Sequence, residues 1–249
     1  WRYRSSKKLA IIWVKNFKFL NSRHLKKIVA ITKGVKDEYV DKKIINKNKI
    51  IILPSGSSIK KRFEFLNKKN FFKIGYFGSL YKSRGLDLIA KLAKIDNKNQ
   101  YFLYGDFDKI RNFKLKNSIK NLHLKNYVPY KEVPKNLSKM DILLMPYVSS
   151  ITAAGDVGDN TKFTSPLKLF DYLSVGKIIL CSDFQVLKEV IDDKKNAIFI
   201  TNYKNIFSWK NEIDKLSNQP QKQLIMPRNN YKLSKSYSLK ERAKLILKS

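Results

Sequence analysis

The segment from Thr164 to Lys177 (TSPLKLFDYLSVGK) has residues at its start that could bind a phosphate group. Ser165 is suited to the N-cap of a helix, and Pro166 is suited to its first turn. The amides of Leu167 and Lys168 would then have no partner within the helix. Free amides and the helix dipole together favour an anion at this position.

Asp171 follows one helical turn after Leu167 and falls on the same face of the expected helix. A carboxylate at this position could accept hydrogen bonds from a vicinal diol, such as the ribose of a nucleotide. An ordinary capped helix with one solvated aspartate would give the same pattern, because caps of this kind are common. This segment alone leaves both interpretations open.

A second segment, Lys73–Asp87 (KIGYFGSLYKSRGLD), combines a strand, a glycine turn, a basic loop and a helix start. This is the usual place for a phosphate in an open α/β sheet. Gly78 would allow a ligand to approach the backbone closely, and Lys82 and Arg84 could neutralise a diphosphate. The segment is not the GxGxxG dinucleotide fingerprint, so a simple strand-to-helix turn is the alternative.

Short apolar runs alternate with amphipathic stretches along the chain, which predicts an α/β fold with a parallel sheet covered by helices. The predicted strands are Lys27–Ile31, Ile50–Leu53, Phe72–Phe77, Gln100–Tyr104, Ile142–Met145, Ile178–Cys181 and Ala197–Ile200. The predicted helices are Val35–Ile45, Leu86–Ala93, Lys131–Lys139, Pro166–Val175, Phe184–Ile191, Tyr203–Leu216, Gln221–Leu233 and Leu239–Leu247.

The order of these elements predicts one complete domain and part of another. The turn- and charge-rich run Pro54–Asn70 is typical of a linker, and we place the linker at residues 59–70. Residues 1–58 hold too few strands to close a domain, whereas residues 71–235 hold enough for a doubly wound one. The chain begins with Trp1, so we expect a fragment or a processed product.

Composition narrows the function classes. The 249 residues carry a net charge of +32, but the lysines are spread along the whole chain, so we expect no nucleic-acid ligand. The single cysteine, Cys181, is expected in the core and fits a cytoplasmic protein without disulfides. His24 and His123 are expected at the surface, because no second ligand recurs at metal-binding spacing.

Taken together, the two segments resemble the C-terminal domain of the GT-B glycosyltransferases of family four, which use retaining chemistry. The resemblance runs from about Lys27 to the end of the chain. Its motifs are GSLYKSRG, YGD at 104–106, VPYKEVP at 128–134, MDILLMPY at 140–147 and SPLKLFDYLSVGKII. It implies one complete Rossmann-like domain, the remnant of an acceptor-binding domain, and a closing helix at 236–249. The SPLKLF subtype is similar to enzymes that build bacterial surface polysaccharides.

The resemblance also implies roles for residues at the matching positions. The donor diphosphate would be bound by Gly78, Ser79, Lys82, Arg84, Leu167 and Lys168. Asp171 would take the place of the family's ribose-binding glutamate, and Val128, Pro129 and Tyr130 would lie near the base. No metal or cofactor is expected besides the nucleoside diphosphate sugar itself.

Besides aspartate in place of glutamate at Asp171, two departures from the family pattern affect the expected site. Ser79 stands where the family often has arginine, so Lys82 or Arg84 must supply the positive charge. Phe163 stands where the family has the first of two glutamates, and the acidic loop Asp156–Asp159 could substitute for it. The family's general base or orienting residue comes from the N-terminal domain, so we name none.

The function implied is transfer of a sugar, with retention, from a nucleoside diphosphate sugar to an acceptor hydroxyl of a polysaccharide or lipid-linked glycan. The positive charge is also compatible with peripheral contact with an anionic membrane. The alternatives are a related enzyme, such as a nucleotide-sugar epimerase or a phosphorylase, and a noncatalytic nucleotide-binding module. The phosphorylase would require a cofactor-binding lysine context that we do not find in the sequence.

Overall fold

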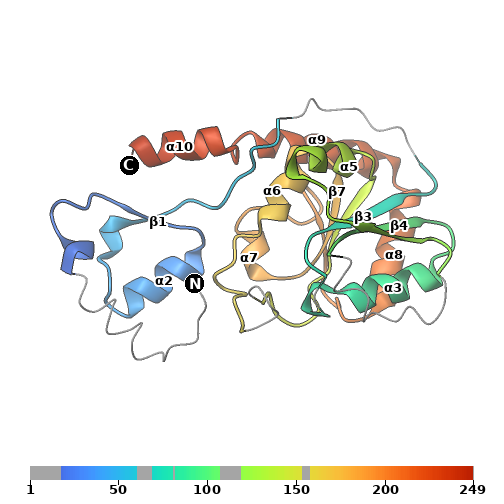
Figure 1. The fold of residues 1–249 in the computed structure, drawn as a ribbon, viewed down its shortest axis with the longest axis horizontal. Coiled ribbons are helices and arrows are strands. Elements are labelled where there is room, and N and C mark those ends of the chain that lie inside the picture. The colour runs from blue at the N-terminus through green and yellow to red at the C-terminus, as the bar shows by residue number, and fades with distance from the viewer. Residues whose placement is uncertain (1–17, 61–68, 81, 107–118, 153–157, 249) are drawn as a thin grey trace.

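The computed structural model describes residues 18–60, 69–80, 82–106, 119–152 and 158–248. Its larger unit is a six-stranded parallel sheet with the strand order β5-β4-β3-β6-β7-β8 (Figure 1). These strands are β3 (Lys73–Phe77), β4 (Gln100–Gly105), β5 (Leu122–Asn126), β6 (Ile142–Met145), β7 (Ile178–Ser182) and β8 (Ile198–Ile200). The α/β fold predicted from the sequence is confirmed.

The apolar strand sequences fold this way because the central strands are buried on both faces. In β6, Ile142 and Leu144 point into the core on one side of the sheet, and Leu143 and Met145 point into the core on the other. Strand β7 alternates in the same way. Since successive side chains of a strand point to opposite faces, a continuous apolar run is what a sheet covered on both sides requires.

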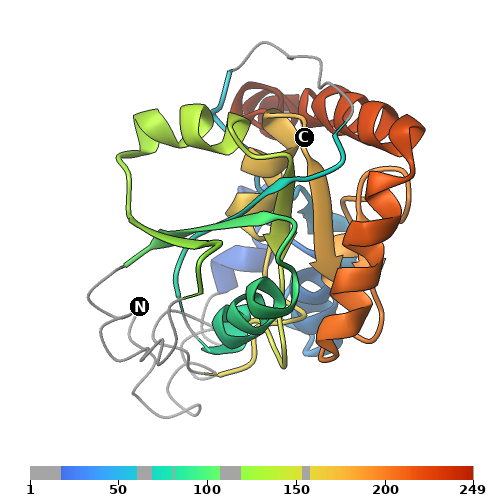
Figure 2. The ribbon, with the colours of Figure 1, turned by 90° about the vertical axis from the view of Figure 1, so that its right-hand side faces the viewer.

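Helices cover both faces of the sheet (Figure 2). One face packs against α3 (Leu86–Ile95) and α8 (Ile206–Ser217). The other packs against α5 (Val133–Ser138), α6 (Leu167–Ser174) and α7 (Gln185–Lys188). Helix α9 (Pro220–Ser234) contacts both α6 and α8. Short 3₁₀ turns at Lys82–Arg84 (η3) and Tyr130–Glu132 (η4) precede α3 and α5.

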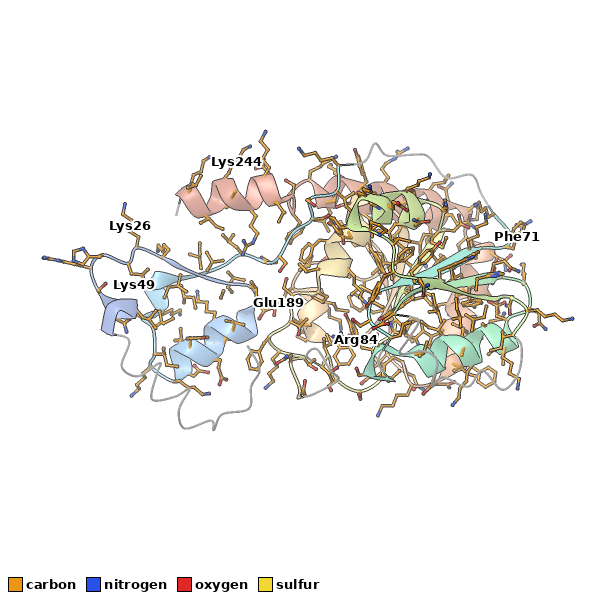
Figure 3. The ribbon with its side chains drawn as sticks, viewed as in Figure 1. Lys26, Lys49, Phe71, Arg84, Glu189 and Lys244 are labelled. Atoms are coloured by element: carbon orange, nitrogen blue, oxygen red, sulfur yellow. The ribbon has the colours of Figure 1, made fainter. Side chains whose placement is uncertain are left out.

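The strand order places a crevice between β3 and β6. The chain moves outward from β3 to β4 and β5 on one side, and from β6 to β7 and β8 on the other. The loops after β3 and β6 therefore leave the sheet in opposite directions, and ligands of open α/β sheets bind at such a switch point. Phe71 lies just before β3 and Arg84 follows it, so they mark the two ends of the sheet, and Arg84 lies at the end nearer the smaller unit (Figure 3).

The smaller unit is a two-stranded parallel sheet of β1 (Ile28–Ala30) and β2 (Ile50–Ile52) with helix α2 (Lys33–Asp41). The 3₁₀ turns η1 (Lys18–Asn21) and η2 (Lys47–Lys49) flank it. Its core is small and centres on Ala30, Ile45 and Ile50. The start of α2 touches the larger unit, where the amide of Lys33 donates to Glu189 at 2.9 Å.

In the structure the linker begins soon after β2, earlier than the predicted 59–70, and its described part, residues 54–60, lies against the returning C-terminal segment. The amide of Ser57 donates to the carbonyl of Tyr237 at 3.0 Å, and the amide of Leu239 donates to the carbonyl of Ser57 at 3.1 Å. Helix α10 (Leu239–Lys248) follows, and its Arg242 donates to the carbonyl of Pro54 at 3.0 Å. In Figure 1, α10 extends from the larger unit toward the smaller one.

Strand β5 is the one strand of the larger sheet that the sequence analysis missed. Its sequence, LHLKN, is half-exposed because β5 is an edge strand paired only with β4. The other strands and the helices lie where they were predicted, to within a few residues at their ends. No helix in the described part of the chain is long and apolar enough to span a membrane.

Candidate functional site

A cleft of about 540 Å³ opens at the carboxyl ends of β3 and β6. It is lined by the loop after β3, the start of α6 and the β5–η4 loop. Its walls include Gly78, Ser79, Arg84, Tyr104, Tyr127, Val128, Tyr130, Tyr147, Ser165, Leu167, Lys168 and Asp171. The structure thus brings the two segments singled out in the sequence together in one cleft.

Helix α6 begins one residue later than the sequence predicts. Pro166 is the N-cap, with extended backbone and no side-chain capping hydrogen bond. Ser165 was expected there, but its hydroxyl instead accepts a hydrogen bond from the amide of Ser55 at 2.9 Å. The amides of Leu167 and Lys168 are therefore the first of the helix, and no side chain of the described residues caps them.

The side chain of Lys168, and not only its amide, lies in the cleft. Its Nζ donates to the hydroxyl of Tyr76 at 2.9 Å and lies 4.1 Å from the centroid of the Tyr76 ring. The Tyr76 hydroxyl in turn donates to the carbonyl of Ser79 at 2.7 Å. Burial and the nearby Arg84 guanidinium hold the pKa of Lys168 well below its usual value.

Arg84 enters the cleft from the end of η3. One of its guanidinium nitrogens donates to the carbonyl of Thr152 at 2.7 Å, and its Cζ lies 5.1 Å from the centroid of the Tyr147 ring. The next residue, Gly85, has φ of 76°, and a Cβ there would lie 2.0 Å from the carbonyl oxygen of Pro146. Only glycine therefore lets this loop approach the end of β6 closely enough to place Arg84.

The Tyr147 hydroxyl is buried beside the Arg84 guanidinium, and its own proton has no acceptor within the described residues. Tyr147 is 1% exposed and lines the cleft. Burial raises the pKa of its phenol to about 12, so the hydroxyl is neutral and can donate. An unpaired buried donor at the wall of a cleft is suited to a ligand that brings an acceptor.

The glycine turn after β3 differs in detail from the sequence-based expectation. The amide of Gly78 was expected to face the donor, but it donates to the carbonyl of Tyr104 at 3.0 Å and continues the pairing of β3 with β4. Gly78 lines the cleft, and a Cβ added to it would lie 3.0 Å from Nζ of Lys168. Ser79 also lines the cleft. The side chain of Lys82 lies outside the described residues.

Asp171 lies in the cleft and is held by two hydroxyl groups. Its Oδ1 accepts from Ser57 at 2.6 Å and from Tyr130 at 3.2 Å. Burial raises the pKa of the Asp171 carboxyl, and the hydrogen bonds from Ser57 and Tyr130 oppose this shift. The sequence analysis did not anticipate Ser57, which belongs to the linker.

Aromatic and aliphatic side chains form the other end of the cleft. Val128 and Tyr130, both predicted to lie near a base, line it together with Tyr127, while Pro129 serves as the N-cap of η4 and is not among the lining residues. The rings of Phe77 and Tyr104 stack at 4.3 Å between centroids. Flat apolar surfaces of this kind are suited to a nucleobase.

The acidic candidates outside the two segments do not join the cleft in the described structure. Asp159 is exposed and accepts from the amide of Thr161 at 2.8 Å, and Phe163 is not a lining residue. Asp156 lies outside the described residues. The described parts of the chain hold no group of three or more histidine, cysteine or carboxylate side chains placed to bind a metal.

Residues 57–233 match the family of glycosyl transferases group 1. This chain belongs to that family. The matched region contains the whole six-stranded sheet and every residue of the cleft described above, so the resemblance to a glycosyltransferase seen in the sequence is confirmed. A search of curated proteins gave no significant match.

Solved structures of other proteins share the fold of this family member. HepE from Anabaena in complex with UDP-glucose superposes with a TM-score of 0.66 at 11% identity, over 90% of this chain and 63% of HepE. Sucrose-phosphate synthase from Thermosynechococcus elongatus gives 0.69 at 10% identity, over 98% and 61%. A point mutant of S. aureus TarM, in complex with fondaparinux, alpha-GlcNAc-glycerol and UDP, gives 0.69 at 16%, over 98% and 46%. This chain therefore spans less than two thirds of these proteins.

Proposed function

We propose that this chain is the donor-binding part of a glycosyltransferase that moves a sugar from a nucleoside diphosphate sugar to an acceptor hydroxyl. The observation that carries the proposal is the cleft at the switch point of the sheet. The first amides of α6 lie in it beside Lys168 and Arg84, while aromatic side chains line its other end. Family membership and the UDP-glucose in the complex of HepE support this choice of ligand.

In this proposal each end of the cleft recognises one part of the donor. The diphosphate binds between the start of α6 and Arg84, where the amides and the guanidinium can hold its oxygens. The ribose hydroxyls donate to Asp171, and the base lies against Tyr127 and Val128. Asp171 has one methylene fewer than glutamate, so the ribose must approach α6 closely.

The same groups would assist the reaction. Negative charge develops on the diphosphate as the glycosidic bond to the sugar breaks. Fixed amides and cations at that position stabilise the transition state more than the ground state. The proposal therefore requires no metal ion. It also includes retention at the anomeric carbon, a hexose as the sugar, and a polysaccharide or lipid-linked glycan as the acceptor.

The proposed location is the cytoplasm, at the inner face of the membrane, where a lipid-linked acceptor would be present. The net charge of +32 supports contact with anionic lipid. The fondaparinux and alpha-GlcNAc-glycerol bound to the TarM mutant support a glycan-type acceptor.

Calorimetric titration with UDP, GDP and ADP tests the donor site. We expect one of the three nucleotides to bind at a single site, and we expect Arg84→Met to weaken that binding. We also expect no sugar transfer by this chain alone, because the family's orienting residue comes from the other domain. If none of the three nucleotides binds to folded protein, the proposal is wrong.

A further inference from the structure

Ser57 belongs to the linker, but its side chain reaches the cleft. It is buried, at 3% exposure, whereas its neighbour Ser58 is exposed. Its hydroxyl donates to Oδ1 of Asp171 at 2.6 Å, and Asp171 lines the cleft. A hydroxyl that donates to a carboxylate forms a charge-assisted hydrogen bond, which is among the stronger kinds. A linker residue therefore contacts the group to which the proposed donor site assigns the ribose.

The position and direction of this hydroxyl are set by the backbone around it. The amide of Ser57 donates to the carbonyl of Tyr237, and the carbonyl of Ser57 accepts from the amide of Leu239. The amide of Ile59 donates to Oγ of Ser57 at 3.0 Å. Because this amide points a proton at Oγ, the one proton of the hydroxyl is left to point at Asp171. The donor is thus in place before any ligand arrives.

The two oxygens of the Asp171 carboxylate differ in their partners. Oδ1 accepts from Ser57 and also from Tyr130 at 3.2 Å, which uses both of its lone pairs. Oδ2 accepts no hydrogen bond from the residues that the structure describes. Since Asp171 lines the cleft, Oδ2 is the oxygen that remains for a ligand. A side chain that is already held in one rotamer loses less freedom when the ligand binds.

We propose that Ser57 is a positioning residue for ribose recognition: its hydroxyl holds Asp171 in the rotamer in which Oδ2 accepts from a hydroxyl of the ribose. The inference rests on the donor site proposed above. Ser57 acts through Asp171 and does not itself contact the nucleotide. Because aspartate has a shorter reach than glutamate, the direction of its carboxylate matters more. A hydroxyl that only fastened the linker to α6 would contribute to stability and would not distinguish one nucleotide sugar ring from another.

Calorimetry with ribose and deoxyribose nucleotides tests the proposal. The nucleotide that binds among UDP, GDP and ADP is titrated into the full chain, and so are its 2′-deoxy and 3′-deoxy forms. The ribose preference is the affinity for the ribonucleotide divided by that for the weaker deoxy form. We expect a preference of about tenfold or more in the wild type, since a hydrogen bond to a charged group is lost with the hydroxyl.

Ser57→Ala is expected to bind the ribonucleotide about three- to tenfold more weakly and the weaker deoxy form with nearly unchanged affinity. In an Asp171→Ala background, Ser57→Ala should have no further effect on the ribose preference. Ser174→Ala is the matched control, because Ser174 is a buried serine of α6 whose hydroxyl donates to the carbonyl of Phe170, outside the cleft. It should keep the ribose preference of the wild type.

Circular dichroism and thermal unfolding establish that each variant is folded. Ser57→Ala should melt at a lower temperature, since the amide of Ile59 loses its acceptor. If Ser57→Ala does not fold, Ser57→Cys gives the same comparison, because a thiol of similar size is only a weak donor.

The outcomes distinguish this inference from the proposed function. If Ser57→Ala weakens the ribonucleotide and the deoxy forms equally, or weakens neither, Ser57 only fastens the linker and the inference is overturned. A wild type that binds nucleotide without a ribose preference also overturns the inference, but it leaves the diphosphate part of the donor site in place. Failure of every nucleotide to bind overturns the donor site, and the inference with it.

Discussion

The hydroxyl of Ser57 and the carboxylate of Asp171 form a hydrogen bond of 2.6 Å between the linker and helix α6. The proposed ribose-binding group therefore touches the segment that joins the two units of the chain. The Ser57 backbone is also hydrogen-bonded to the returning C-terminal segment. Ribose hydroxyls that donate to Asp171 compete with Ser57 and Tyr130 for the same carboxylate.

Replacing the Asp171 carboxylate is expected to weaken nucleotide binding without unfolding the protein. Asp171 is only partly buried, so Asp171→Ala leaves the core intact. We expect an affinity loss of about tenfold or more, from the loss of charge-assisted hydrogen bonds to the ribose. Asp171→Asn keeps an acceptor oxygen and should lose less. Calorimetry and thermal unfolding measure both effects, and collapse of the fold in Asp171→Ala would favour a purely structural role.

Tyr76→Phe is expected to disturb both stability and binding. The variant keeps the ring beneath Lys168 but leaves Nζ of Lys168 and the carbonyl of Ser79 without their partner. We expect a loss of about 1–3 kcal/mol in the free energy of unfolding and severalfold weaker nucleotide binding. Denaturant unfolding and calorimetry provide the two measurements.

Tyr101→Phe is the matched control for this experiment. Tyr101 is also fully buried, and its hydroxyl donates to Asp96 at 2.6 Å, but it does not line the cleft. A comparable loss of stability with unchanged nucleotide affinity is expected. If Tyr76→Phe changes affinity no more than Tyr101→Phe does, Tyr76 has no role in positioning the site.

Arg84 is expected to contribute to nucleotide binding through the planar shape of its guanidinium as well as through its charge. Arg84→Met should weaken nucleotide binding by about 10- to 100-fold, because a charge-assisted contact to phosphate is lost. Arg84→Lys keeps the charge but loses the planar group that stacks on Tyr147 and reaches Thr152, so it should restore only part of the affinity. Salt titrations should show a weaker salt dependence for Arg84→Met than for Arg84→Lys. Equal affinities for the two variants would show that geometry alone matters.

Gly85 and Gly158 separate the cost of a positive φ in a non-glycine residue from the cost of a steric clash of its Cβ. Both have positive φ, 76° and 66°, but a Cβ on Gly85 would meet the Pro146 carbonyl at 2.0 Å, whereas a Cβ on Gly158 would meet nothing within 4 Å. We expect Gly85→Ala to cost about 2–6 kcal/mol and to reduce nucleotide binding by displacing Arg84. Gly158→Ala should cost only about 1–2 kcal/mol. Equal losses of stability in the two variants would contradict this account of the η3 turn.

Lys168→Met is expected to stabilise the empty protein. The depressed pKa of Lys168 means that the unfolded chain binds more protons than the folded one between that pKa and the ordinary lysine value. The free energy of unfolding of the wild type should therefore rise with pH across this window, and that rise should be smaller in Lys168→Met. Near neutral pH the melting temperature of the variant should be higher, since each kcal/mol corresponds to about 2–4 °C in a chain of this size. A lower melting temperature would contradict the desolvation argument.

Most of the fold was predictable from the sequence because its central strands are buried on both faces. The apolar runs that became β6 and β7 have no other stable position in an α/β unit. Strand β5 was not predictable in the same way, since an edge strand requires only a partial apolar pattern, and the sequence LHLKN supplies no more than that.

The sequence predicted only those parts of the site whose position follows from the ends of the strands. Arg84 and the start of α6 share a cleft because both follow neighbouring parallel strands, whose carboxyl ends meet at one edge. The contact of Lys168 with Tyr76 depends on how α6 packs across β3, which the sequence pattern does not encode. The register of β3 with β4 places the carbonyl of Tyr104 opposite the Gly78 amide, so the amide is bonded within the sheet. The sequence pattern does not determine this register.

The hydrogen bonds of Ser57 with Tyr237 and Leu239 tie the linker to the segment that leads into α10. Neither segment can move away from the other without breaking these bonds, so the path of the linker out of the larger unit is coupled to that of α10. A chain that ended before Tyr237 would leave the linker without both of these hydrogen bonds.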